Sequence, residues 1–131
     1  MFSYPLIRIR WGDLMKYTNS IKKKGTFKYL INKGKFASEK YLVVYLIKNN
    51  KPNNMLGICI SKKNGISVHR NKMKRWAREV YKEEEIKMKK GLTVVIMYKK
   101  HTLLDDIDYY KIKKNILNAF KKLDVYEVNN D

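Results

Sequence analysis

The sequence predicts an α/β fold, an α+β sandwich-like domain with a small sheet and the element order α-β-β-α-β-α. Three runs rich in β-branched and aromatic residues, at positions 41–47, 55–61 and 92–98, are typical of buried strands. A long amphipathic stretch separates the second run from the third, and another follows the third. This β-α-β pattern implies parallel pairing or a split arrangement. The chain has 131 residues, a length that predicts a single domain.

The first expected element is a helix over residues 21–33. Phe27, Leu30 and Ile31 recur there at the i, i+3, i+4 spacing of one helical face. Gly34 suits the position just after a helix, because glycine adopts a left-handed conformation without Cβ strain. The strands at 41–47 and 55–61 follow, joined by a loop rich in Pro and Asn.

The longest helix is expected from Val68 to about Lys89. On a helical wheel, one arc of about 100° is apolar and would face the core. A separate arc of about 140° carries basic and amide side chains. The apolar arc holds Met73, Trp76, Ala77 and Val80, and the polar arc holds Arg70, Asn71, Lys74, Arg75, Arg78 and Lys82.

The third strand and a final helix complete the pattern. Gly91 ends the long helix, and the strand at 92–98 follows it. Asp105 or Asp106 can cap the last helix, since a carboxylate suits unpaired N–H groups. Its core stripe is Tyr109, Ile112, Ile116, Phe120 and Leu123.

The net charge of +18 indicates a polyanionic partner. It divides into +10 over residues 1–60, +9 over 61–100 and −1 over 101–131. Lysine outnumbers arginine by 25 to 5, so the arginines are the more informative cations. Three of the five, Arg70, Arg75 and Arg78, fall within nine residues. A local excess of this kind is typical of a phosphate-binding face.

Other classes of function find little support in the sequence. The single cysteine, Cys59, excludes a disulfide framework and a cysteine zinc site, and we expect it to be a small buried side chain. His69 and His101 are too sparse for a metal site or a catalytic dyad. No apolar run reaches the ~18 residues needed to cross a bilayer, so we expect no membrane partner and a cytoplasmic protein.

The segment from Ser61 to Tyr81 carries the strongest functional signal. It places two lysines in the turn after a strand, and then a helix with guanidinium and ammonium groups at spacings of four. Arginine forks clasp phosphate oxygens in a bidentate way, and Asn71 offers both a donor and an acceptor. Such a helix suits folded nucleic acid.

These residues resemble the signature of the bacterial ribonuclease P protein component family, roughly S-K-K-x-G-x-A-V-x-R-N-R-x-K-R-x-x-R-E. Two positions depart from it: Lys72 replaces an arginine, and Ser67 replaces a common alanine. The upstream stretch from Lys22 to Gly34 is similar to the opening helix of that family. The resemblance covers about residues 20–123, which implies one domain there, an N-terminal extension over 1–19 and a tail over 124–131.

The resemblance implies a left-handed β-α-β crossover, a hand that the usual right-handed rule would not predict. It also implies an accessory role. A large catalytic RNA removes the 5′ leader of precursor tRNA, and Mg²⁺ is bound mainly by that RNA and not by the protein alone. The protein contributes no catalytic residue and no metal ligand. We expect it to be a monomer whose partners are the ribonuclease P RNA and the precursor tRNA leader.

Site residues carried over from the resemblance fall into two groups. The RNA-binding set is Lys62, Lys63, Arg70, Asn71, Lys72, Lys74, Arg75 and Arg78. The leader-binding set is Phe27, Ile31 and Tyr45. Aromatic faces beside a cationic track would hold single-stranded RNA on physical grounds as well. Strand alternation predicts that Tyr41 and Tyr45 share one face of the sheet, with Phe36 nearby.

Two alternatives remain open at the level of the sequence. One is another structured-RNA-binding module, resembling a ribosomal protein, with no processing role. The other is a protein nuclease that uses Asp105, Asp106 and Asp108 to hold a divalent metal. Helix capping is the simpler explanation of those carboxylates.

Overall fold

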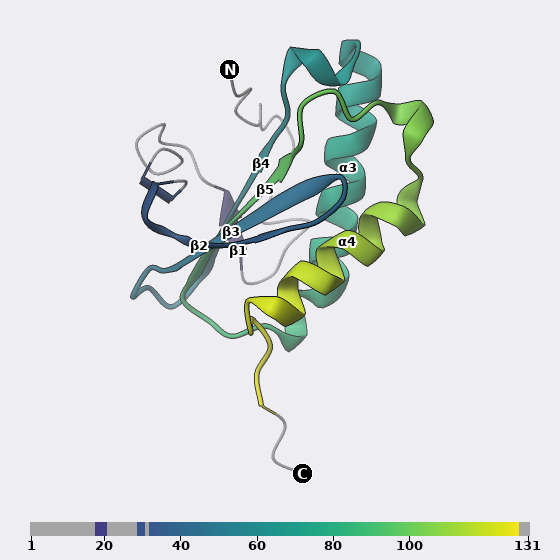
Figure 1. The fold of residues 1–131 in the computed structure, drawn as a ribbon. Helices are drawn as coiled ribbons and strands as arrows, with labels where there is room; N and C mark the ends of the chain where they lie inside the picture. The colour runs from purple at the N-terminus through teal and green to yellow at the C-terminus, as the bar shows by residue number, and fades with distance from the viewer. Residues whose placement is uncertain (1–17, 21–28, 31, 129–131) are drawn as a thin grey trace.

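The structure is a computed structural model that describes residues 18–20, 29–30 and 32–128. A five-stranded mixed sheet has the order β1-β4-β5-β3-β2 (Figure 1). The pair β4–β5 and the pair β1–β4 are parallel, and the pairs β3–β5 and β2–β3 are antiparallel. The strands are β1 (Thr18–Ser20), β2 (Lys35–Ser38), β3 (Leu42–Lys48), β4 (Asn54–Cys59) and β5 (Leu92–Tyr98).

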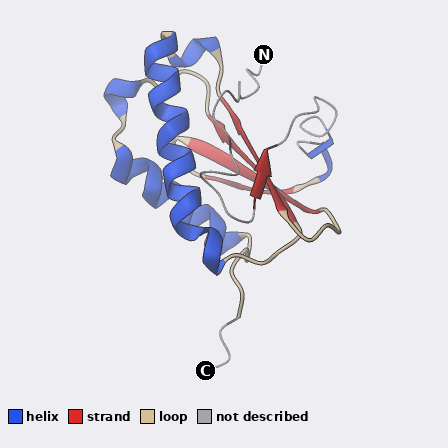
Figure 2. Ribbon diagram, turned by 180° about the vertical axis from the view of Figure 1, so that it is seen from behind, coloured by secondary structure: helices blue, strands red, loops and turns tan. Residues whose placement is uncertain are grey.

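Two long helices cover one face of this sheet (Figure 2). Helix α3 (Ser67–Glu84) connects the parallel strands β4 and β5, and α4 (Tyr109–Lys122) follows β5. Short 3₁₀ turns precede or follow these helices: η1 (Lys62–Asn64), η2 (Glu85–Lys87) and η3 (Leu104–Asp106). The β-α-β unit expected from the sequence is therefore confirmed, and its left hand stays a prediction.

The main core lies between the sheet and these helices. Alternate residues of β3 (Leu42, Val44 and Leu46) point into it, as do Leu56 and Ile58 of β4. The apolar arc of α3 meets them, with Met73, Ala77, Val80 and Tyr81 buried and Trp76 partly buried. The expected stripe of α4 is confirmed: Ile112, Ile116 and Phe120 are buried, and Tyr109 and Leu123 pack beside them.

The opposite face of the sheet carries a smaller apolar cluster. Leu30, Cys59 and Val95 are buried there, and Tyr45 and Met97 are among the half-buried side chains around them. Tyr29, Leu30, Asn32 and Lys33 are helical, so the described part of the 21–33 prediction is confirmed. A Cβ on Gly34 would lie 2.7 Å from the Leu30 carbonyl oxygen, which explains the need for glycine at this close approach.

Several boundaries differ from the sequence prediction. Strands β1 and β2 are additional, because segments of three and four residues are too short for a periodic signal. Helix α3 ends at Glu84 and continues only as η2, and β4 ends at Cys59. The cap of α4 is Asp108, whose Oδ1 accepts from the Lys111 amide at 2.8 Å; the expectation of Asp105 or Asp106 is wrong.

Residues after α4 return to the helix layer. Val125 is fully buried in the main core, and its carbonyl accepts a hydrogen bond from the Lys89 amide. Tyr126 forms a β-bridge with Met88, and its hydroxyl donates to Glu84. These contacts connect the segment after α4 to the end of α3 and the residues that follow it.

Candidate nucleic-acid interface

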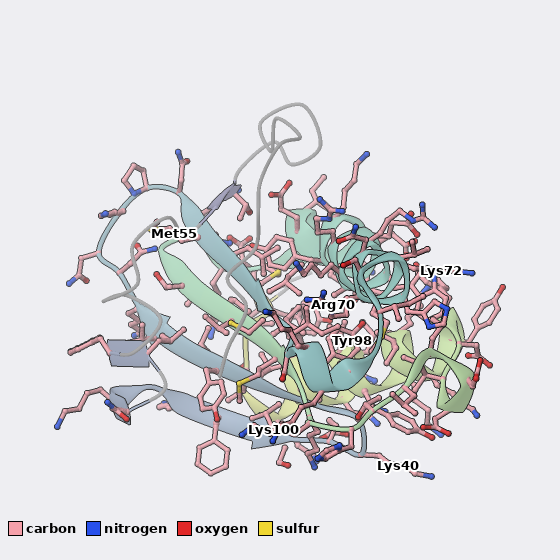
Figure 3. The ribbon with its side chains drawn as sticks, turned by 90° about the horizontal axis from the view of Figure 1, so that it is seen from above. Lys40, Met55, Arg70, Lys72, Tyr98 and Lys100 are labelled. Carbon is pink, nitrogen blue, oxygen red and sulfur yellow. The ribbon has the colours of Figure 1, made fainter. Side chains whose placement is uncertain are left out.

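One row of cations on α3 lies beside the sheet. Arg70, Lys74 and Arg78 are spaced one helical turn apart, and each is partly buried. Arg70 points from α3 toward the sheet, whereas Lys72 points to the outer side of the helix (Figure 3). We call Arg70, Lys74 and Arg78 the inner cationic row.

The cations of the inner cationic row are partly desolvated and repel one another. Burial first, then the charges of Arg70 and Arg78, hold the pKa of Lys74 below its ordinary value. Burial and the charge of Arg75 lower the pKa of Arg78, with Glu79 acting in the opposite direction. The Nε of Arg70 is buried and has no hydrogen-bond partner in the described part of the chain, while one Nη donates to Ser67 Oγ at 3.0 Å. Clustered, partly desolvated cations of this kind favour an anionic ligand.

The outer side of α3 presents a second set of polar groups. Asn71, Lys72 and Arg75 are exposed. The Lys72 ammonium lies 5.5 Å from the ring centroid of Trp76, which orients it by a cation–π contact. Arg75 Nε and Glu79 Oε1 are 4.0 Å apart, and both side chains are more than half exposed, so this pair holds Arg75 weakly.

Three acidic residues at the end of α3 and in η2 contact other elements of the fold. Glu83 accepts from the Tyr109 hydroxyl and pairs with Lys113, both from α4. Glu84 accepts from the Tyr126 hydroxyl. Glu85 accepts from the hydroxyl of Thr18, at the start of β1. The N-terminal half of α3, residues 67–75, carries four cations and no acid, whereas three glutamates offset the two cations of its C-terminal half.

The turn η1 fixes the two lysines that precede α3. Ser61 and Asn64 form a capping box: Ser61 Oγ accepts from the Lys63 amide, and Asn64 Oδ1 accepts from the Ser61 amide. Asn64 is fully buried, and its Nδ2 also donates to the carbonyl oxygens of Lys99 and Thr102 at 2.8 and 2.9 Å. Lys62 and Lys63 are thereby exposed on a rigid turn.

The same hydrogen bonds bring a second basic segment beside η1. The Asn64 side chain donates to carbonyl oxygens at both ends of the loop that contains Lys100 and His101. Lys100 and His101 are both exposed. The Lys99 amide also donates to the Tyr41 carbonyl, which places Lys40 and Lys100 on neighbouring loops (Figure 3). Sequence reasoning missed this grouping, although the S-x-x-N spacing of a capping box was visible.

The N-terminus of α3 has first-turn amides that no N-cap side chain covers. Its N-cap is Ile66, which supplies no side-chain hydrogen bond to the first turn. The first-turn amides therefore carry the positive end of the helix dipole without a side-chain cap. Helix N-termini of this kind accept phosphate groups.

The sheet face opposite the two long helices, which we call the open face, carries the remaining candidate residues. Tyr45 lies there, and its ring centroid is 6.1 Å from that of Phe36. Tyr41 does not share this face: it precedes β3 and packs against the helix-side core, so that prediction is wrong. The prediction failed because β3 begins at Leu42, and the alternation of side chains between the two faces holds only within the strand. Phe27 and Ile31 lie outside the described residues.

Burial raises the pKa of two titratable side chains on this face, Cys59 and Tyr45. Cys59 is fully buried, as expected, and burial raises the pKa of its thiol to about 12, against a smaller lowering by Lys74. Lys74, which belongs to α3 on the other side of the sheet, thus has an electrostatic effect on a residue of the open face. Burial also raises the pKa of Tyr45. Neither group is suited to acid–base work near neutral pH.

The described residues show neither a metal-binding cluster nor a membrane-spanning helix. In residues 18–20, 29–30 and 32–128, no three His, Cys, Asp or Glu side chains gather as a metal site would require. Asp106 accepts from the Leu103 amide and Asp108 caps α4, so local capping occupies two of the three carboxylates of the nuclease hypothesis. No helix in these ranges is long and apolar enough to span a bilayer.

Comparison with known proteins decides the family. The family model described as Ribonuclease P matches residues 15–124. The chain belongs to the ribonuclease P protein family. A ribonuclease P protein component from Clostridium botulinum strain 657 is 38% identical over 109 residues, covering 82% of this chain and 96% of that protein. One from Thermotoga maritima is 29% identical over 75% of this chain and 86% of that protein.

Solved structures of ribonuclease P proteins share the fold. The Staphylococcus aureus RNase P protein aligns with a TM-score of 0.74 and 28% identity, over 82% of this chain and 97% of that one. The Thermotoga maritima protein aligns with a TM-score of 0.67 and 27% identity, over 76% of this chain and 93% of that one. The chain is therefore an accessory subunit of ribonuclease P, the enzyme of tRNA 5′ processing, and ribonuclease P RNA is its partner.

Proposed function

We propose that α3 and η1 form the surface that docks on ribonuclease P RNA. The set comprises Lys62, Lys63, Arg70, Asn71, Lys72, Lys74, Arg75 and Arg78. The observation that carries the proposal is the clustering of six of these seven cations on η1 and the N-terminal half of α3, away from Glu83 and Glu84 at its C-terminal end. An uncapped helix N-terminus supports phosphate binding at the same end.

The open face of the sheet is proposed as the site of the single-stranded 5′ leader of precursor tRNA. Tyr45 supplies an aromatic surface there, and Phe27 and Ile31 stay predicted contacts. Lys74 is close enough to Cys59, a residue of this face, to affect the pKa of its thiol, which supports a cation of the inner cationic row near the β4 end of the face. Stacking surfaces beside a cationic track are what single-stranded RNA requires.

Magnesium belongs to the RNA in this proposal. The described residues offer no cluster of carboxylates that fits Mg²⁺, since Asp106 and Asp108 serve as caps. The protein docks, orients and captures, and it acts as a monomer in the complex. On this basis the protein without RNA cleaves no precursor tRNA.

Reconstitution with a bacterial ribonuclease P RNA tests the docking surface. The dissociation constant is measured for the wild type, Arg70→Gln and Arg75→Gln over a range of salt concentrations. Each substitution removes one phosphate contact, so affinity falls and the slope of log K against log salt decreases by about one. Leader removal at low Mg²⁺ falls in parallel.

Lys114→Gln is the matched control, because Lys114 is an exposed cation of α4. It should retain the wild-type affinity and salt slope. Wild-type behaviour of both arginine variants would contradict the docking surface. Cleavage of precursor tRNA by RNA-free protein would contradict the accessory role.

A further inference from the structure

Phe36 is a large apolar side chain placed at the edge of the sheet without burial. Its side chain is 65% exposed, and β2 is the last strand of the sheet on that side. Its neighbour Ala37 points to the helix-side core. Since successive side chains of a strand alternate, Phe36 points to the open face.

The strand register places Phe36 at the outer end of a row on the open face, and only the β2–β3 end of that row is exposed. Phe36 pairs with Tyr45, Tyr45 with Val95, and Val95 with Gly57. Directly paired residues share a face. Neighbouring strands are about 4.8 Å apart, so the row from β2 to β4 spans about 14 Å. Val95 is fully buried and Gly57 is buried, so the part of the row open to a ligand is its Phe36–Tyr45 end.

The two ends of this row differ in chemistry. Phe36 and Tyr45 make the β2 end aromatic and partly exposed, whereas the β4 end is buried and includes Cys59, the pKa of whose thiol Lys74 lowers slightly against the larger effect of burial. Strand β4 pairs with β1 only over Asn54–Leu56, so Gly57–Cys59 has no strand on its outer side within the described residues. The Phe36 and Tyr45 rings are therefore the part of this row that a base can reach.

The ring geometry determines how bases can bind. The planes of Phe36 and Tyr45 are tilted by 41°, with centroids 6.1 Å apart. A base sandwiched between two rings needs parallel planes separated by about 7 Å, twice the carbon–carbon contact distance. The rings therefore offer their outward surfaces to two different bases.

We propose that Phe36 is a second stacking position for the single-stranded leader, which extends the site proposed above from Tyr45 onto the edge strand β2. This inference rests on the proposed function of the open face. It makes Phe36 a residue that determines how much of the leader the protein recognises, and it adds one base to the contact that Tyr45 makes.

Binding of precursor tRNA to the reconstituted holoenzyme tests the inference. Dissociation constants are measured for a leader of one nucleotide and a leader of about eight, with wild type, Phe36→Ala, Phe36→Leu and Phe36→Tyr. Loss of one stacked base weakens binding of the long leader by about fivefold or more, with no change for the short leader. Phe36→Leu shows the same loss because it keeps apolar bulk without a ring, and Phe36→Tyr retains affinity.

Tyr110→Ala is the matched control, since Tyr110 is a 77% exposed aromatic of α4 on the other side of the sheet. It should bind both leaders as the wild type does. Thermal melting of each variant checks the fold, and the leucine variant keeps the packing against Tyr45.

The role of Phe36 is overturned if Phe36→Ala binds the long leader as tightly as the wild type, or loses affinity equally for both leaders. Tyr45→Ala separates the two proposals. Its loss of long-leader affinity together with unchanged Phe36→Ala binding refutes Phe36 alone. Unchanged binding by both variants refutes the leader site itself.

Discussion

At the scale of single residues, Asn64 organises more of the interface than any one cation does. It bears no charge and contacts no ligand, yet its amide group joins the end of β4 to the loop after β5 through three hydrogen bonds. Two basic segments that are far apart in the sequence are thereby held side by side. Positioning of this kind favours recognition because it reduces the entropy lost when the basic segments bind.

Asn64→Ala should destabilise the protein and loosen the two lysines of η1. The substitution leaves the Ser61 amide and the carbonyls of Lys99 and Thr102 without their partner, which costs about 2–3 kcal/mol of the free energy of unfolding. Urea denaturation measures the loss. Asn53→Ala, at an exposed loop position, is the control and should change stability by less than about 0.5 kcal/mol. An equally small effect at Asn64 would disprove the positioning role.

At the scale of elements, the contact between α3 and α4 directs one carboxylate of α3, that of Glu83, toward α4. Glu83 Oε1 accepts from the Tyr109 hydroxyl at 2.9 Å, and Glu83 Oε2 lies 3.1 Å from Lys113 Nζ. The Tyr109 hydrogen bond first, and then Lys113, hold the pKa of Glu83 below its ordinary value. Glu83 is therefore directed toward α4, at the opposite end of α3 from Arg70.

Glu83→Gln should flatten the loss of stability in acid. Because the folded pKa is below the ordinary value of 4.5, ionised Glu83 stabilises the fold above pH 4.5, and this contribution disappears as pH falls through the lowered pKa. The pair is half exposed and screened, so the melting temperature at neutral pH falls by only about 1–3 °C. Melting curves from pH 7 to pH 3 measure both effects.

The exposed Glu127 provides the control for this experiment. Glu127→Gln should leave the acid limb of the melting curve as in the wild type. If Glu83→Gln retained the full wild-type loss of stability in acid, the contact with α4 would not be the cause of the lowered pKa.

At the scale of the whole molecule, a net charge of +18 on 131 residues makes the free protein repel itself. The inner cationic row concentrates this repulsion: burial first, and then the charges of Arg70 and Arg78, lower the pKa of Lys74. Bound RNA would relieve it. The isolated protein thus carries a cost in stability at the surface that we propose for binding, the usual compromise between stability and function.

Lys74→Gln should raise the melting temperature of the free protein by roughly 1–3 °C in low salt, while it weakens binding to the RNA. The gain should shrink near 0.15 M salt, where the Debye length is about 8 Å. Calorimetry at two salt concentrations measures it. A lower melting temperature in low salt would show that Lys74 stabilises the fold and would refute the repulsion argument.

The sequence predicts the long elements well because their signals are local and repeated. The strand at 92–98 coincides with β5, and the apolar arc of α3 is the arc that is buried. Its polar arc, however, divides into an inner and an outer part. Periodicity gives the direction of a side chain around the helix axis, but not the position of the neighbouring β4 edge that partly buries Lys74.

Long-range pairing accounts for what the sequence could not supply. The partner of Tyr45 on the open face is Phe36, across the β2–β3 register, and not Tyr41, which is four residues away along the chain. The link from Asn64 to the loop at Lys99 likewise joins residues 35 positions apart. Such contacts depend on the assembled sheet, so no local pattern could reveal them.

Cys59 has a practical consequence for work on this protein. Its thiol is the only one in the chain, is fully shielded from solvent and has a pKa of about 12, so maleimide or iodoacetamide reagents would find almost no thiolate there. A cysteine introduced at a surface position would therefore be modified selectively in the native background. Fluorophores or spin labels can follow the assembly with RNA without prior removal of the natural sulfhydryl.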